Sequence, residues 1–322
     1  MKDQDHDEKI DAAKPGDDEA SWSRRVFLGA AAAGAAGLVM GARESNMVSG
    51  EKTGGKLPTL YIPHGGGPCF FMEWTMGPRD TWDNMANWLR SVGQRYAKPK
   101  ALLVISAHWE ERVVTVQSGE RPALFYDYYG FPPHTYELTW PAPGAPAVAA
   151  RVRSLLEKAG IPSTEDKNRG FDHGVFVPLK VAYPEAGIPT LQLSLNANLD
   201  PATHLAIGRA LAPLRNEGVL IIGSGMSFHN MRAFMRQGVL GESQRFDGWL
   251  ANTCCGEPPA RNAGLVQWAQ APAGRFSHPR EEHLLPLMVV AGAADGEAGR
   301  QVFTDQVMGV VVSAFEFGDQ HA

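Results

Sequence analysis

The stretch TLYIPHGGGP, residues 59–68, joins a short apolar run to a histidine and three successive glycines. A short apolar run bounded by turn residues is typical of a buried strand. Glycines remove side chains and permit backbone angles that other residues avoid, so three of them beside His64 indicate that something other than protein approaches the backbone there. The stretch therefore predicts a strand over residues 59–63 that ends in a binding loop.

Similar patterns recur along the chain and predict the fold class. Further apolar runs bounded by turn residues predict buried strands over residues 101–106, 189–195, 219–223 and 309–315. Between them, apolar residues at helical spacing predict helices over residues 145–158 and 202–215, followed by Gly160 and Gly218. Strands that alternate with helices favour an α/β sandwich around a mostly parallel central sheet.

The composition is that of a soluble globular protein. The 322 residues are 44% hydrophobic and 20% charged, which is enough apolar material for a large core. The net charge of −5 comes without a basic cluster, which argues against nucleic acid as a partner. Because no internal repeat and no linker follows residue 57, we expect a single domain over residues 57–322. The sequence alone predicts no oligomeric state.

The first residues differ from the rest of the chain. The segment SRRVFL, residues 23–28, precedes an apolar stretch rich in Ala and Gly that runs to Ala42, an arrangement that resembles a twin-arginine export signal. The alternative is an uncleaved membrane anchor. The stretch is shorter than the about 20 apolar residues of a membrane-spanning helix, which favours the export signal over the anchor. We expect residues 1–43 to be recognised by the twin-arginine export machinery, residues 44–56 to form a flexible spacer, and the protein to be periplasmic or otherwise exported.

Three histidines follow three of the predicted strands. His64 follows the strand over residues 59–63, His108 lies just past the run over 101–106, and His229 lies in the loop after 219–223. Ligands of open α/β sheets bind outside the carboxyl ends of the strands, so these imidazoles are expected to converge if the strands are parallel. The alternative is that each is an ordinary hydrogen-bonded loop histidine.

Two further histidines are candidates for the same site. His283 and its neighbour Glu282 stand at the expected start of a buried helix. Because neighbours on a helix point about 100° apart, only one of the two is expected to bind directly, and we favour His283. His173, beside Asp172, is a candidate acid/base or a residue that orients a ligand.

A cluster of imidazoles without thiolates suits a divalent metal ion such as Zn²⁺, Fe²⁺, Mn²⁺ or Co²⁺. The cysteines, Cys69, Cys254 and Cys255, form no CxxC motif and are interpreted as structural thiols. The glycines at residues 65–67 would leave an open side of the ion for a substrate. Export of folded protein through the twin-arginine route is compatible with such a metalloprotein.

Several motifs resemble one known family when they are taken together and in order. They are PHGGGP (63–68), ISAHW (105–109), the aromatic segment 126–136 that opens with YDYYGFP, FDHGV (171–175), GSG (223–225) with His229-Asn230, and EHLLPL (282–287). This set is similar to the class III extradiol ring-cleavage dioxygenases, and within them to the 4,5-DOPA dioxygenase group. The resemblance runs from about residue 57 to the C-terminus.

The resemblance implies a three-layer α/β/α sandwich with one divalent metal ion, Fe(II) or Zn(II). His64, His108 and His283 match the metal-binding positions, His229 matches a position that is a further ligand or the acid/base, and His173 matches a catalytic histidine that borders the substrate pocket. In this family a small aromatic catechol binds ferrous iron through both oxygens, O2 binds alongside, and the ring is cut next to the diol. The aromatic segment 126–136 suits a pocket for a flat ring.

Two features depart from the family pattern and leave alternatives open. The loop reads HGGGP where better-known members have a shorter His-Gly-Ser-Pro type, and an export signal is unexpected. A site of mainly histidines, with Glu282 as its one obvious carboxylate, also binds Zn²⁺ readily. The alternatives are a Zn-dependent hydrolase, which needs no oxygen, and a non-catalytic metal-binding protein on the same scaffold.

Overall fold

The computed structural model describes residues 55–96, 98–294 and 296–318, which lie in one compact unit, Glu51–Ala322. The predicted signal segment, 1–43, lies outside the described residues, as does the predicted spacer, 44–56, except for its last two residues. The domain boundaries therefore stay a prediction. Among the described helices, none combines the length and the apolar character that a membrane span requires.

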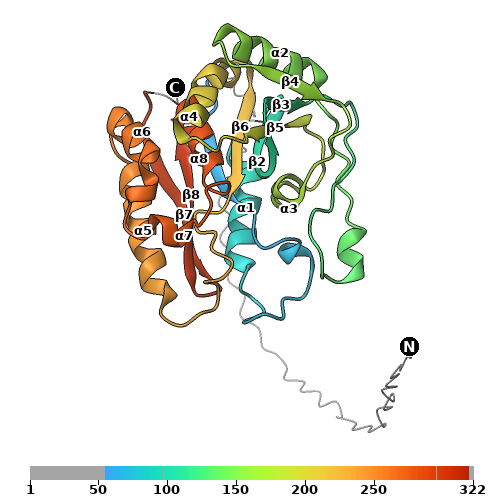
Figure 1. The fold of residues 1–322 in the computed structure, drawn as a ribbon. Coiled ribbons are helices and arrows are strands. Elements are labelled where there is room, and N and C mark those ends of the chain that lie inside the picture. Colours follow the sequence, from blue (N-terminus) through green and yellow to red (C-terminus); the bar gives the residue numbers. More distant parts are fainter. Residues whose placement is uncertain (1–54, 97, 295, 319–322) are drawn as a thin grey trace, which may run out of the picture. The chain divides into compact units, whose positions relative to one another are not determined.

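The centre of the fold is a mixed, mostly parallel sheet in the order β4-β3-β5-β2-β6-β1-β8-β7 (Figure 1). The strands are β1 (Thr59–Pro63), β2 (Ala101–Glu111), β3 (Val114–Gln117), β4 (Ser163–Asp166), β5 (Thr190–Asn196), β6 (Val219–Gly225), β7 (Gly299–Val307) and β8 (Val310–Phe317). The central strands β5, β2, β6 and β1 run parallel, whereas β8 is antiparallel to both β1 and β7. The predicted α/β class is confirmed.

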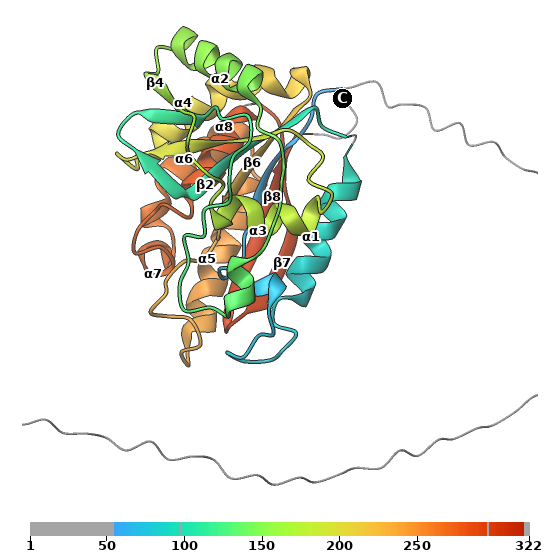
Figure 2. The ribbon, with the colours of Figure 1, turned by 90° about the vertical axis from the view of Figure 1, so that its right-hand side faces the viewer.

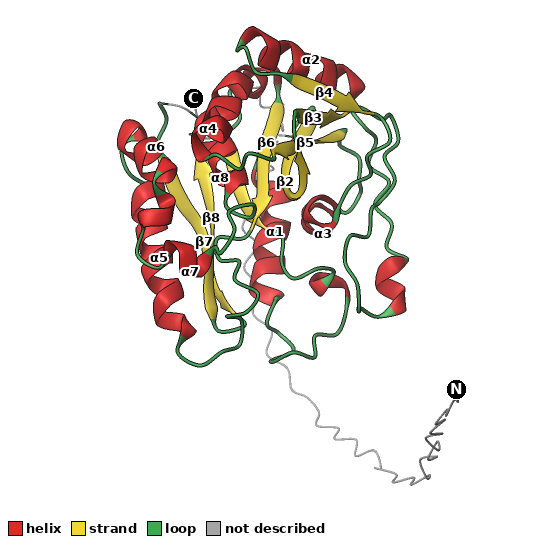
Figure 3. Ribbon diagram, viewed as in Figure 1, coloured by secondary structure: helices red, strands yellow, loops and turns green. Residues whose placement is uncertain are grey.

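Helices cover both faces of this sheet, as Figure 3 shows. One face carries α1 (Asp83–Arg95) and α3 (His173–Ala182), and the other carries α2 (Pro146–Lys158), α4 (Pro201–Leu211), α5 (Val239–Cys254), α6 (Pro258–Val266) and α8 (Leu285–Ala293). Shorter helical turns are Cys69–Phe71, Pro133–Tyr136, Ala212–Glu217, Trp268–Gln270 and α7 (Gly274–Ser277). The layers can be followed from the side in Figure 2.

Two apolar cores lie between these layers, and the alternation of side chains along β2 shows why. Leu102 and Val104 belong to the core under α1 and α3, while Leu103 and Ile105 belong to the core under α4 and α8. Successive strand residues point to opposite faces, and a sheet covered on both faces needs apolar residues at every position. Such continuous apolar runs were the signal that predicted the strands.

The structure corrects the predicted position of His108. This residue does not follow the end of its strand but lies within β2, which continues to Glu111. The pairing of β2 with β6 ends at Ser106, and its register against β5 shifts between Ile105 and Glu110. The strand therefore bulges where His108 lies, and a bulge of this kind redirects a side chain without ending the strand.

Candidate active site

The glycine loop is shaped by its own backbone and by close packing. His64 follows β1 directly, and its amide donates to the Gly225 carbonyl at the end of β6, 3.2 Å away. Gly65 and Gly67 have φ angles of 82° and 57°, in the left-handed region that favours glycine. A Cβ at Gly65 would lie 2.5 Å from the Cys69 sulfur. The glycines thus fix the path of the loop as well as leaving its surface open.

His64, His108 and His283 converge at this end of the sheet. The Nε2 atoms of His64 and His108 are 3.3 Å apart, and the His283 ring centroid is 5.2 Å and 4.9 Å from those of His64 and His108. One ring nitrogen from each lies within 4.8 Å of the others. This spacing is compatible with three nitrogens around one metal ion.

Hydrogen bonds orient two of these rings for metal binding. Nδ1 of His64 lies 2.9 Å from the Gly65 carbonyl, and Nδ1 of His283 lies 2.9 Å from a Glu282 oxygen. Because a carbonyl and a carboxylate can only accept, both Nδ1 atoms carry the proton and both Nε2 atoms keep a free lone pair. The buried Nε2 of His283 has no hydrogen-bond partner. This orphaned nitrogen is the atom that a metal ion would satisfy.

The electrostatics keep these three imidazoles neutral. Burial lowers the pKa of His64, His108 and His283 well below the ordinary histidine value, and neighbouring histidines lower it further. Neutral imidazole is the form that binds metals.

The backbone of His283 is held by a close approach of β6. The Tyr61 hydroxyl and the Met226 amide donate to its carbonyl at 2.7 Å and 3.2 Å. A Cβ at Gly225 would lie 2.1 Å from the same oxygen, so the second glycine of the GSG motif cannot carry a side chain. His283 precedes α8, which begins at Leu285, and lies in a turn rather than in the first turn of the helix as predicted.

Because of that turn, Glu282 and His283 both reach the site. One Glu282 oxygen lies 2.9 Å from Nδ1 of His283 and 3.3 Å from Nδ1 of His229. The His229 ring stacks on His283 with 3.3 Å between centroids. Burial on its own raises the pKa of Glu282, but the hydrogen bond from His229 contributes to holding it below the ordinary value. His229, Glu282 and His283 form a second group that could hold a metal ion.

His173, at the start of α3, completes the cluster from the other side. Its ring centroid lies 3.9 Å from that of His108 and 5.3 Å from that of His64. Its Nδ1 and its backbone amide both lie 2.8 Å from one Asp127 oxygen. Nδ1 therefore donates to the carboxylate, and Nε2 is left to accept.

Asp127 belongs to the site although no local sequence pattern indicated it. It lies 46 positions from His173, inside the aromatic segment, and no spacing rule links the two. Burial on its own raises its pKa, but the hydrogen bonds from the ring and the backbone amide of His173 hold it below the ordinary value. The sequence neighbour Asp172 instead accepts from Ser106 at 2.6 Å and pairs with Arg169 at 3.0 Å. Through Ser106, Asp172 thus stabilises β2 next to the bulge that contains His108.

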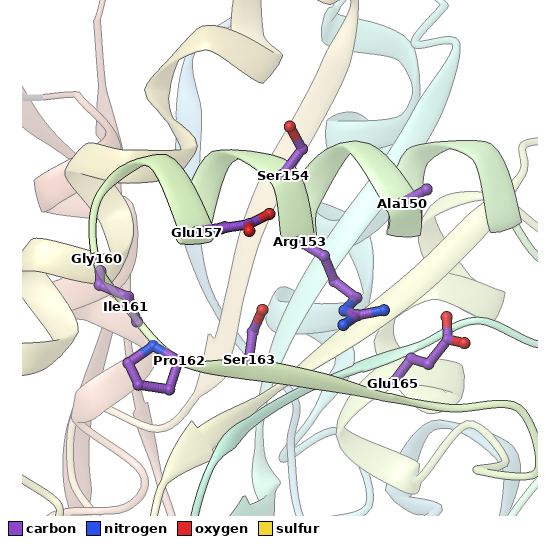
Figure 4. A pocket seen from close by; sticks show the side chains of 9 residues that line it. All are labelled: Ala150, Arg153, Ser154, Glu157, Gly160, Ile161, Pro162, Ser163 and Glu165. Carbon is purple, nitrogen blue, oxygen red and sulfur yellow. The ribbon is translucent and has the colours of Figure 1, made fainter.

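The cluster opens into a cavity of about 730 Å³. All five histidines line it, together with Tyr128, Tyr129 and Phe131 of the aromatic segment. This volume is in the range of sites for small organic ligands. Another cavity, of about 570 Å³ between α2 and β4, has none of these lining residues (Figure 4). The histidine cavity is therefore the candidate substrate site.

Comparisons with known proteins agree with this geometry. The family model of the catalytic LigB subunit of aromatic ring-opening dioxygenase matches residues 58–316. The chain is 36% identical to dioxygenase tasH of Hapsidospora irregularis over 82% of this chain and 86% of that protein. It is 41% identical to the 4,5-DOPA dioxygenase extradiol of Beta vulgaris, over 71% and 85%.

A solved structure is also similar. The crystal structure of an uncharacterised protein from Escherichia coli K12 superposes with a TM-score of 0.66 at 32% identity, covering 81% of this chain and all of that one. The region matched by the family model contains every histidine of the cluster.

Proposed function

This chain belongs to the family of catalytic LigB subunits of aromatic ring-opening dioxygenases, and from that premise we propose that its histidine cluster supports extradiol cleavage of a catechol with Fe(II). It is an extradiol ring-cleaving dioxygenase, an oxidoreductase, which sets aside the hydrolase and the non-catalytic protein. The observation that carries the proposal is the convergence of His64, His108 and His283 on the wall of the cavity.

The proposed ligands are His64, His108 and His283. Support comes from the orphaned Nε2 of His283, from the Nδ1 hydrogen bonds that leave the Nε2 atoms of His64 and His283 unprotonated, and from the spacing of the three residues. A bound Fe(II) ion would bring the diol and dioxygen together and favour the ionised diol. The all-nitrogen ligand set also suits Zn(II), which we propose as an inactive competitor.

The remaining histidines are proposed to hold and move protons. Nδ1 of His229 lies 3.3 Å from a Glu282 oxygen, so its proton would be directed to the carboxylate and its Nε2 would accept a proton from the second hydroxyl of the substrate. His173, fixed in the same way by Asp127, borders the ring on the other side of the cluster. Two carboxylate-backed histidines thus flank the proposed ligands, and His229 is the proposed base.

Oxygen consumption tests this function directly. Protein purified without oxygen, reconstituted with Fe(II) and mixed with a panel of catechols is expected to take up one O2 per catechol and form a coloured semialdehyde. A Zn(II)-loaded sample is expected to take up none. Failure of every catechol to give uptake with Fe(II) would overturn the proposal.

We also propose that residues 1–43 direct export through the twin-arginine pathway, since Arg24 and Arg25 precede a weakly apolar stretch. Fractionation of cells that express the full chain is expected to recover the folded enzyme outside the cytoplasm. Recovery in the cytoplasm alone, by a host with an active pathway, would contradict this.

A further inference from the structure

The charged side chains of the histidine cavity are already paired with one another. Among the described residues, Glu110, Asp127 and Glu282 are the acidic lining residues and Arg280 is the one cationic lysine or arginine. Asp127 accepts from His173, and Glu282 contacts His229 and His283. Two of the three carboxylates thus contact histidines of the cluster.

Arg280 is paired just as fully. Its two terminal nitrogens donate to the two oxygens of Glu110 at 2.5 Å each, and one of them lies 3.4 Å from a Glu282 oxygen. The Arg280 side chain is 53% exposed, so this pair lies on the solvent side of the cavity. A two-point pair of this kind fixes the guanidinium geometrically. A carboxylate on a substrate would have to displace Glu110 and would also meet Glu282.

The rest of the wall is apolar. The aromatic lining residues are Trp74, Trp82, Tyr128, Tyr129, Phe131 and Phe234. Flat aromatic faces pack well against a substituted ring.

The methionines that complete the wall are Met76, Met226, Met231 and Met308. Methionine is flexible and polarisable, and it adapts to ligands of different shape. Two of the lining residues are also unusually exposed: Tyr129 at 91% and Met231 at 71%. Large exposed apolar side chains around a cavity are typical of a surface that a ligand covers.

We propose that the substrate is a catechol with an uncharged, apolar substituent rather than one with a carboxylate, an ammonium or an amino-acid group. This inference rests on the proposed function, because it assumes that the diol binds at the histidine cluster. The diol end meets the histidines, and the substituent lies along the aromatic and methionine wall. A carboxylate finds no unpaired cation among the described lining residues, because Arg280 is held by Glu110. An ammonium meets only carboxylates that already face Arg280 or histidines; the Glu282 oxygen without a hydrogen bond lies 3.4 Å from Arg280.

Four catechols of similar size separate the possibilities: propylcatechol, dihydroxyphenylpropionate, dopamine and DOPA. With the Fe(II)-loaded enzyme, kcat/KM for propylcatechol is expected to exceed that for each charged catechol by about tenfold or more, since like-charge contacts and unpaired charges disfavour the others. A charged catechol that equals or exceeds propylcatechol would overturn the inference.

A binding measurement keeps this test separate from that of the function. The Zn(II)-loaded protein, titrated calorimetrically without oxygen, is expected to bind propylcatechol about tenfold more tightly than dihydroxyphenylpropionate. If no catechol is turned over but this order of affinity holds, the proposed function fails and the preference stands. If oxygen is consumed and the order is reversed, the function stands and the preference fails.

A variant that removes the carboxylate paired with Arg280 tests the role of that pair. Glu110→Gln leaves Arg280 without its two-point partner, so the ratio of kcat/KM for dihydroxyphenylpropionate over propylcatechol is expected to rise by about tenfold. The matched control is Glu217→Gln, which breaks a comparable exposed pair with Arg151 outside the cavity lining. An unchanged ratio in Glu110→Gln, or an equal rise in both variants, would count against the inference. The comparison of catechols with the unsubstituted enzyme stands whether or not either variant folds.

Discussion

His108→Ala is expected to abolish metal retention and, with it, oxygen uptake. The variant removes the nitrogen that lies 3.3 Å from Nε2 of His64 and leaves two of the three proposed ligands. Loss of a residue that merely orients a ligand costs about 10–100-fold in metal affinity, and loss of a ligand is expected to cost more. The measurement is metal content after gel filtration of the Fe(II)- and Zn(II)-loaded variant, beside its rate of oxygen uptake.

The matched control for this variant is His134→Ala. His134 is an exposed histidine that contacts the Phe71 carbonyl and is not part of the cavity wall. Its replacement is expected to leave metal content unchanged. A His108→Ala protein that keeps one metal ion per chain would remove His108 from the ligand set, and a loss in both variants would point to a general effect on folding.

His229→Ala is expected to keep most of the metal and to lose about 10²–10⁴-fold in kcat. The reason is that Glu282 still holds Nδ1 of His283 at 2.9 Å, so the three proposed ligands stay oriented while the proposed base is gone. Metal content and kcat are measured on the same preparation.

The metal loss of His229→Ala, compared with that of His108→Ala, distinguishes a base from a ligand. If His229→Ala loses as much metal as His108→Ala, His229 is a further ligand, a possibility that fits the group formed by His229, Glu282 and His283. His229→Gln serves as a second variant, because it retains hydrogen-bonding capacity next to Glu282 but cannot take up a proton at neutral pH.

The sequence predicted the central strands well because their signal is local. Strands β1, β2, β5, β6 and β8 each contain the apolar run that predicted them, and the predicted segments match the observed bounds to within two residues except in β2, which continues to Glu111. The edge strands β4 and β7 were missed for the same reason, and the short inner strand β3 was missed as well. In β4 no residue is buried, and β7 mixes exposed and partly buried residues over most of its length, so neither contains an apolar run.

The candidate site was predictable only where it depends on strand ends. The parallel order of β2, β6 and β1 brings His64, His108 and His229 to one edge of the sheet, as the pattern of histidines after strands indicated. Contacts between side chains distant in sequence have no such pattern. Arg280 and Glu110 are 170 positions apart, and only the fold brings them together.

The glycine loop also constrains how this enzyme can change its substrate over evolution. Gly65 and Gly67 combine left-handed backbone angles with contacts to Cys69 and Phe131 that a Cβ would violate. A substitution at either glycine would distort the loop together with His64, so side chains are not expected to be introduced at these two positions. New specificities are therefore expected to arise among the other lining side chains, the aromatic residues and the methionines, which can be exchanged while the metal ligands stay fixed.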